Sequence, residues 1–374
     1  GGWNIGADIV VGDDMLVSAG TVTGTEDITI SNGSLSGNGV LSLGGGTTTL
    51  AVSNTLGGTS PWTFYNLQLG NGSAVGTTTP AFTSTTTVSS RLTIANAHFL
   101  DAGDTDWNLS GTGTVFVETG TFLEDTSRIR YSGNSSNVLS TQYYDLDINA
   151  AAGTPTYTAV GIGTIVTNDL TVGGTAPTTF NINTNDPLYD INGDVIVRSN
   201  GTLVLSGSAI FRIAGDYDNN GTVTASGGRV TFDGTGATSI AAGNSSFANV
   251  TVLSTGNVTV TEHATATANW LLAGATTFGV SSGQALSVGG QFHNGVAGGV
   301  TTWTGSTLRL YGGLDYTINA ATSSDSYATL DIDDTTQIRM WSSDASSYSV
   351  SSGASLYSQD HAAVDGDLYI WGAY

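Results

Sequence analysis

The chain has 374 residues, of which 52 are glycine and none is cysteine, and its 30 acidic and 8 basic side chains give a formal net charge of −22. This charge argues against a nucleic-acid partner, because phosphate recognition needs clustered cations, and the absence of cysteine excludes thiol catalysis, disulfides and cysteine-bound metals. No apolar run approaches the ~18 residues of a membrane-spanning helix, whereas 39% hydrophobic residues are enough to build a core.

Short strands separated by turns are predicted along the whole chain. Aspartate far outnumbers glutamate and lysine is absent, a composition typical of turns and strands rather than of helix surfaces. Glycine, asparagine or aspartate closes each segment after a few residues. The sequence therefore predicts an all-β protein. In chain order, the clearest strand segments are residues 28–30, 115–117, 128–131, 203–205 and 308–311.

An aromatic residue followed by a small step and an alternating strand recurs four times. The first aromatic residues of these motifs lie 79, 104 and 80 residues apart, at Phe64, Tyr143, Phe247 and Tyr327. Two of the intervals are close to three times 26 and the third is four times 26, which indicates a repeating unit of about 26 residues. A solenoid accepts one extra unit with little disturbance, because each coil contacts only its neighbours.

These spacings predict a β-solenoid, a parallel β-helix of right-handed winding with coils of about 26 residues. Tandem immunoglobulin-like sandwiches have a similar spacing but would need a large loop in the long interval, and a propeller is neither required nor excluded. We expect one continuous solenoid over residues 1–374, with a divergent N-terminal part at 1–47 and super-repeats around 48–126, 127–227, 228–305 and 306–374.

Both ends of the chain are predicted to carry strands without capping elements. Residues 366–374 form an apolar strand that stops partway through its repeat, and exposed strand edges invite further strands. Either the chain is a piece of a longer polypeptide with further repeats, or another copy completes its end. In the second case copies join head to tail, and the residues expected at the contact are Trp3, Ile5, Ile9, Leu368, Ile370 and Trp371.

Several stretches resemble the repeats of giant β-helical surface proteins and adhesins of bacteria, namely residues 215–223, 229–234 and 247–252. The run from Ile338 to Trp371 is similar to segments of large repetitive proteins from candidate-phylum, Patescibacteria-like genomes. The resemblance covers roughly residues 100–374. It implies a secreted structural or adhesive role and supplies no catalytic residues.

No catalytic motif is recognised, and we expect that the chain is not an enzyme. The carboxylate clusters that could act on polysaccharides are interpreted more simply as turn aspartates. His263 and His293 lie 30 residues apart, near one expected coil, so a paired site is an alternative to isolated surface histidines. The clusters are Asp101, Asp104 and Asp106, and Asp331, Asp333 and Asp334.

Calcium is the one ligand for which the sequence gives a positive indication. Asp216, Asp218 and Asn220, followed by Gly221, match the opening of a calcium-binding loop with alternating oxygen ligands. The twelfth position, where such a loop has a bidentate acid, is Gly227. A site would therefore borrow oxygens from a neighbouring coil, and an ordinary Asn/Asp-rich turn is the alternative.

Two functions from different classes follow from the sequence. The first is a non-catalytic extracellular structural protein, a subunit or segment of a β-solenoid surface filament or adhesin stalk that assembles end to end. Its partners would be further copies or further repeats of the same polypeptide, and surface glycans, with no nucleic acid, no membrane span and no required cofactor. The alternative is a polysaccharide-binding or polysaccharide-degrading β-helix module.

Overall fold

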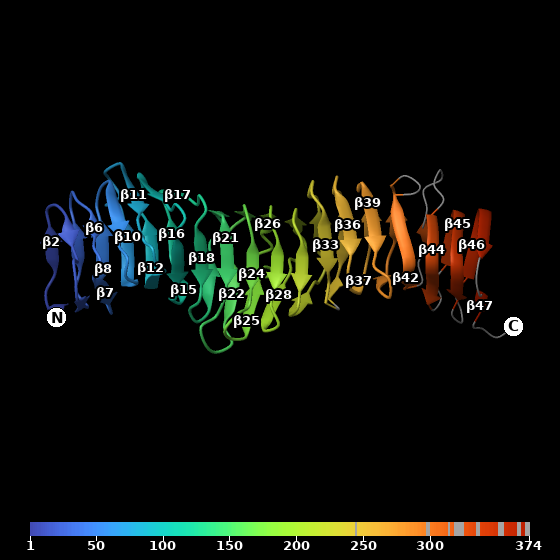
Figure 1. Ribbon diagram of the computed structural model, residues 1–374, viewed down its shortest axis with the longest axis horizontal. Helices are drawn as coiled ribbons and strands as arrows, with labels where there is room; N and C mark the ends of the chain where they lie inside the picture. Colours follow the sequence, from blue (N-terminus) through green and yellow to red (C-terminus); the bar gives the residue numbers. More distant parts are fainter. Residues whose placement is uncertain are drawn as a thin grey trace. The chain divides into compact units, whose positions relative to one another are not determined.

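The fold is that of a β-solenoid, with parallel sheets stacked along the chain and no helix among the described residues. The computed structural model describes residues 1–243, 245–296, 300–312, 315–317, 325–333, 337–350, 355–364 and 368–370. The chain divides into two compact units, Gly1–Pro187 and Leu188–Tyr374. Figure 1 shows the strands of each unit lying side by side in successive coils. The prediction of an all-β solenoid is confirmed.

Alternation of apolar and polar residues decides which side of each strand faces the core. In the strand Ile28–Ile30, both isoleucines are fully buried and Thr29 between them is half-buried on the outer side. The strand Thr47–Leu50 repeats the pattern, with Leu50 buried and Thr49 turned outward. Because successive side chains of a strand point to opposite faces, each short strand contributes one or two side chains to the core and one or two to the surface.

The N-terminal unit is built from stacks of parallel strands, each coil adding one strand to a stack. The first stack contains β1 (Gly2–Ile5), β4 (Thr21–Gly24), β7 (Val40–Leu43), β10 (Trp62–Leu69), β12 (Thr86–Ile94), β14 (Asp106–Leu109), β18 (Arg128–Tyr131), β21 (Asp145–Ile148) and β24 (Leu170–Val172). The second contains β2 (Ile9–Val11), β5 (Ile28–Ile30), β8 (Thr47–Leu50), the later halves of β10 and β12, and β16 (Phe116–Glu118).

The third stack of this unit changes partway along the chain. It begins with β3 (Met15–Leu16), β6 (Leu35–Ser36), β9 (Asn54–Gly57), β11 (Gly76–Pro80), β13 (His98–Asp101) and β17 (Thr121–Leu123). Later coils instead use β15 (Gly113–Thr114), β19 (Ser136–Val138), β22 (Thr156–Ala159) and β25 (Thr178–Asn181). The strands β20 (Gln142–Tyr143) and β23 (Gly163–Val166) pair with each other in a different sheet.

The C-terminal unit has the same three-stack plan. One stack contains β26 (Leu188–Ile191), β29 (Ile210–Ile213), β32 (Arg229–Phe232), β35 (Asn249–Val252), β38 (Trp270–Leu272), β41 (Phe292–Asn294) and β43 (Asp315–Thr317). The second contains β27 (Val195–Val197), β30 (Tyr217–Asn219), β33 (Thr238–Ala241), β36 (Asn257–Val260), β39 (Thr277–Val280) and the start of β42 (Thr301–Tyr311).

The third stack of the C-terminal unit continues to the last described strand. It contains the pair β28 (Gly201–Val204) and β31 (Thr222–Thr224), and then β34 (Ser246–Phe247), β37 (Ala264–Ala266), β40 (Ala285–Val288), the end of β42, β44 (Asp325–Asp333), β45 (Gln337–Val350) and β47 (Leu368–Ile370). The strand β46 (Ser355–Val364) pairs with β45.

The coil length is about 22 residues, so the period expected from the sequence was too long. Individual coils differ in length, since the paired residues Arg130 and Asp147 lie 17 residues apart. The interval from Phe247 to Tyr327 contains four coil steps, from β34 through β37, β40 and β42 to β44. Four short coils therefore span nearly the same length of chain as three coils of the expected period would.

Aromatic side chains from consecutive coils pack edge to face inside each unit. In the N-terminal unit the ring of Phe82 lies 5.8 Å from Trp62 on one side and 5.8 Å from Trp107 on the other. In the C-terminal unit the rings of Tyr217 and Phe247 are 5.4 Å apart. These offset geometries are the favoured ones for aromatic pairs, and they extend the core from coil to coil.

Candidate functional site

In both units, aspartate side chains at the coil corners join one coil to the next. In the N-terminal unit Asp8 lies directly before β2, and Asp27 lies directly before β5. The Asp8 carboxylate accepts the Asp27 N–H at 3.0 Å, and the Asp27 carboxylate accepts the Thr47 N–H at 2.7 Å. Each carboxylate therefore satisfies a backbone donor of the following coil at the corner where the strand begins.

The same arrangement recurs in the C-terminal unit. Asp194 accepts the Asp216 N–H at 2.7 Å, and Asp216 accepts the Ser239 N–H at 2.7 Å. Asp194 and Asp216 again lie directly before strands, β27 and β30, and Ser239 is the second residue of β33. Sequence reasoning missed these corner acceptors, although the signal was present as pairs of aspartates placed directly before strands, 19 residues apart in one unit and 22 in the other.

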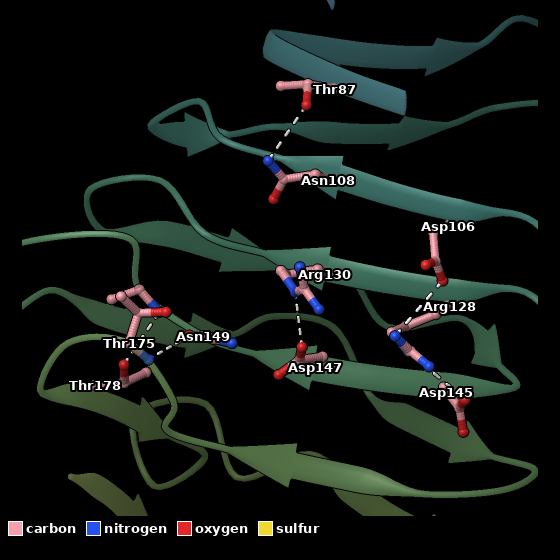
Figure 2. Close-up of polar contacts among 11 residues, drawn as sticks. Thr87, Asp106, Asn108, Arg128, Arg130, Asp145, Asp147, Asn149, Thr175 and Thr178 are labelled. Atoms are coloured by element: carbon pink, nitrogen blue, oxygen red, sulfur yellow. Dashed lines mark hydrogen bonds and ion pairs between the residues drawn. The ribbon is translucent and has the colours of Figure 1, made fainter. Parts of the chain in front are cut away.

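Arginine and aspartate side chains bridge three successive coils on the outer side of β14, β18 and β21 (Figure 2). Arg128 lies between Asp106, at 3.7 Å, and Asp145, at 3.9 Å. The Arg128 and Asp106 side chains are 44% and 45% exposed, and that of Asp145 is 22% exposed. Solvent screening and the long distances leave each pair with little net stabilisation.

The neighbouring pair on the same strands is less exposed. Arg130 Nε donates to Asp147 at 2.7 Å, and the Asp147 side chain is only 11% exposed. Figure 2 shows the guanidinium directed at that carboxylate from the adjacent strand. A buried carboxylate needs such a partner, because desolvation without one is costly.

A comparable ion pair in the C-terminal unit lies beside a third charged group. Arg212 donates to Asp233 at 2.8 Å. Burial, followed by the negative charge of Asp233, raises the pKa of Asp190, while the Arg212 charge acts in the opposite direction. The two carboxylates and one guanidinium therefore form a partly buried charged group on the outer side of β26, β29 and β32.

The three residues proposed for calcium lie along β30 and its two ends, and both aspartates accept hydrogen bonds from the protein. The Asp216 carboxylate is the corner acceptor for Ser239. Asp218 accepts the Asn220 side-chain N–H at 2.8 Å. Asn219, which alternates with them, is buried and donates to Ala242 O at 3.0 Å. Within the described part of the chain, no group of three or more acidic or histidine side chains is arranged to hold a metal ion.

The first carboxylate cluster is divided between different contacts. Asp106 belongs to the Arg128 bridge, and Asp104 lines a small hollow beside Phe82. A hydrogen bond with Asp125, one coil further on, raises the pKa of Asp101, with smaller contributions from burial and from the Asp125 charge. In the second cluster Asp331 lies 3.6 Å from Arg309, Asp333 ends β44, and Asp334 lies outside the described residues.

The histidines do not form the pair that their spacing allowed. His263 lies just before β37 and accepts the Ala285 N–H at 2.9 Å, whereas His293 lies on β41 in a different stack. His98 is fully buried on β13, 2.9 Å from the Thr78 hydroxyl. Burial lowers its pKa.

The residues expected at an end-to-end contact have different environments. Trp3 is 53% exposed on β1, Ile5 on the same strand is buried, and Ile9 is half-buried on β2. The burial of Ile5 places its side chain in the core of the unit. Leu368 and Ile370 belong to β47, which pairs with β45, and Trp371 lies outside the described residues.

These contacts and the fold define a β-solenoid repeat protein. No protein-family model, no curated protein and no solved structure matches the chain. In the part of the chain that the structure describes, no helix is long and apolar enough to cross a membrane.

Proposed function

We propose that the chain is a non-catalytic extracellular structural protein, a subunit or segment of a surface filament or adhesin stalk. The observation that carries this proposal is the use of acidic side chains as coil-to-coil connectors. Asp8 and Asp27 in one unit, and Asp194 and Asp216 in the other, each accept a backbone N–H of the following coil. Such contacts serve the mechanical continuity of a stack.

The charged pairs support the same role. Arg128 and Arg130 each contact an aspartate on a neighbouring strand of the stack, and Arg309 does so in the C-terminal unit. Side chains that could otherwise bind a substrate are thereby engaged between coils. The extracellular location is supported by the sequence resemblance to bacterial surface proteins.

End-to-end assembly is the finer part of the proposal, and the geometry of β2 indicates how it would work. Ile9 N–H donates to Asp27 O at 2.9 Å, and Val11 O accepts the Ser31 N–H at 2.8 Å. In a parallel pair, alternate residues bond to opposite sides, so the N–H and C=O of Val10 point away from β5. We propose that a further coil occupies this edge, from another copy or from additional repeats of the same polypeptide.

A proline scan of β2 tests this edge. Val10→Pro removes an N–H that faces away from β5, and the Val10 side chain is 75% exposed, so the ring has room. We expect the variant to keep the wild-type circular dichroism and thermal midpoint but to form no filaments in electron micrographs. Ile9→Pro is the matched control, since it removes the bond to Asp27 O and should lower the thermal midpoint. Filaments of wild-type length from Val10→Pro would refute end-to-end joining at this edge.

A further inference from the structure

A shallow groove crosses the outer side of β29, β32, β35 and β38 in the C-terminal unit. Its volume is about 520 Å³. No acidic residue is among those lining it, in a chain with 30 acidic side chains. The groove therefore differs in charge from the small hollow of the N-terminal unit, which Asp104 and Asp106 line.

The cation in this groove has no acidic partner among the described residues. Arg229 is exposed at the start of β32, and none of the ion pairs in the described part of the chain includes it. The arginine of the adjacent strand, Arg212, is instead bonded to Asp233 at 2.8 Å. A planar guanidinium left available at the surface is suited to bidentate binding of a carboxylate.

Two asparagines continue from Arg229 along the next two strands in register. Asn249 Nδ2 donates to Gly227 O at 2.9 Å, and Asn249 Oδ1 accepts from the Asn269 side chain at 3.2 Å. Asn269 Oδ1 accepts the Gln291 N–H at 2.8 Å. Each NH₂ group has two donors and uses one of them in these bonds, to Gly227 O for Asn249 and to Asn249 Oδ1 for Asn269. Both asparagines line the groove, so each has a second donor for a ligand there.

The backbone of the groove offers no edge for strand addition by a peptide. β32 pairs with β29 on one side and with β35 on the other, and β35 pairs in turn with β38. Recognition must therefore come from side chains. Ile210 and Leu271 line the groove as half-buried apolar side chains, which can contact the C–H face of a sugar ring, while hydroxyl and carboxylate oxygens accept from the donor row.

We propose that this groove binds a uronate-containing polysaccharide. Arg229 receives a uronate carboxylate, Asn249 and Asn269 donate to ring hydroxyls, and Ile210 and Leu271 contact the ring faces. The ligand class is set by the combination of an available guanidinium, amide donors and fully paired strands. A structural solenoid with this groove would hold acidic glycans along its side.

The test is a calorimetric titration of the full chain with a galacturonate oligosaccharide at physiological ionic strength, where screening limits the repulsion between an anionic ligand and a chain of net charge −22. A neutral galactose oligosaccharide of equal length and a poly-glutamate peptide are the comparison ligands. Arg229→Ala is the test variant. Arg91→Ala is the matched control, because Arg91 is another exposed arginine that is absent from the ion pairs of the described residues and lies in the N-terminal unit.

We expect the uronate to bind wild type, with a loss of about tenfold or more in affinity for Arg229→Ala and no change for Arg91→Ala. Equal losses in the two variants would show a general charge effect and overturn the site. If the neutral oligosaccharide bound equally well, the carboxylate would not be recognised, and the proposed role of Arg229 would be wrong. If poly-glutamate bound equally well, the sugar would not be recognised, and the proposed ligand class would be wrong. The absence of binding to wild type at millimolar uronate would also refute the proposal.

Discussion

Removing a whole coil of the observed length should shorten the C-terminal unit without unfolding it. Asn249 and Asn269, on neighbouring coils, lie 20 residues apart, and the pairs Arg229–Asn249 and Val250–Trp270 have the same spacing. Deleting residues 249–268 joins Ala248 to Asn269 and brings Trp270 opposite Val230. The neighbour of Trp270 stays a valine, since Val230 replaces Val250, and both of these valines are buried. The cut therefore preserves the packing at its junction.

The cost of this deletion follows from the amount of chain removed. Folded domains are stabilised by roughly 0.05–0.15 kcal/mol per residue, so the loss of one such coil should lower the free energy of unfolding by about 1–3 kcal/mol. Solenoid coils contact only their neighbours, and the flanking coils can stack on each other. We expect a modest decrease in the denaturant midpoint, with the circular dichroism signal per residue unchanged.

A deletion of the longer period expected from the sequence is the matched control. Deleting residues 249–274 places Thr276 and Gln284 at the positions of Val250 and Val258, which are buried. Each buried polar group without a partner costs about 1–3 kcal/mol, so this variant should lose about 2–6 kcal/mol beyond the cost of the missing coil. Urea unfolding followed by circular dichroism and tryptophan fluorescence measures both variants. If the longer deletion were tolerated as well as the shorter one, the observed register would be wrong.

Two further predictions concern the charged and titratable groups of the N-terminal unit. Arg130→Met should lower the free energy of unfolding by about 2 kcal/mol because it leaves the mostly buried Asp147 carboxylate unpaired. Arg128→Met should cost less than about 1 kcal/mol in the same urea titration, because Arg128 is itself exposed and lies 3.7 and 3.9 Å from its two acids. Equal losses in the two variants would contradict this. Burial holds the pKa of His98 below 6.5, so the unfolded chain binds its proton first and stability should fall as the pH drops below about 6.5. Urea midpoints at pH 7.5 and pH 5 should show this fall, and a His98→Gln variant with an unchanged pH dependence would exclude His98 as its source.

Local patterns in the sequence were sufficient to predict the fold class. The alternation of Ile28, Thr29 and Ile30 reports burial directly, because a strand has a side-chain period of two, and the observed burial follows it. The coil length was less accessible. The interval from Phe247 to Tyr327 divides almost equally well into four short coils and three longer ones. The corners between strands vary in length and have no regular side-chain pattern, so they do not distinguish the two coil lengths.

The polar contacts depended on register, which the sequence does not display. Asp216 and Asp218 have the spacing of a calcium loop. Asp216, however, lies at a coil corner, where its carboxylate accepts the N–H of Ser239, 23 residues further along the chain. The groove beside Arg229 was missed for the same reason. Its donors are at positions 229, 249 and 269, and only the strand register brings them into one row.

The winding of the chain into short coils also determines how a unit would respond to a pulling force. One coil holds about 22 residues, which can extend to about 75 Å, yet in a parallel stack it advances the structure by only about 4.8 Å. Force applied along the stack would load the hydrogen bonds of the outermost coil and peel that coil before the next. Each rupture would release a long, slack segment, and the remaining coils would keep their structure. A stack wound in this way would yield stepwise under load and absorb work at each step.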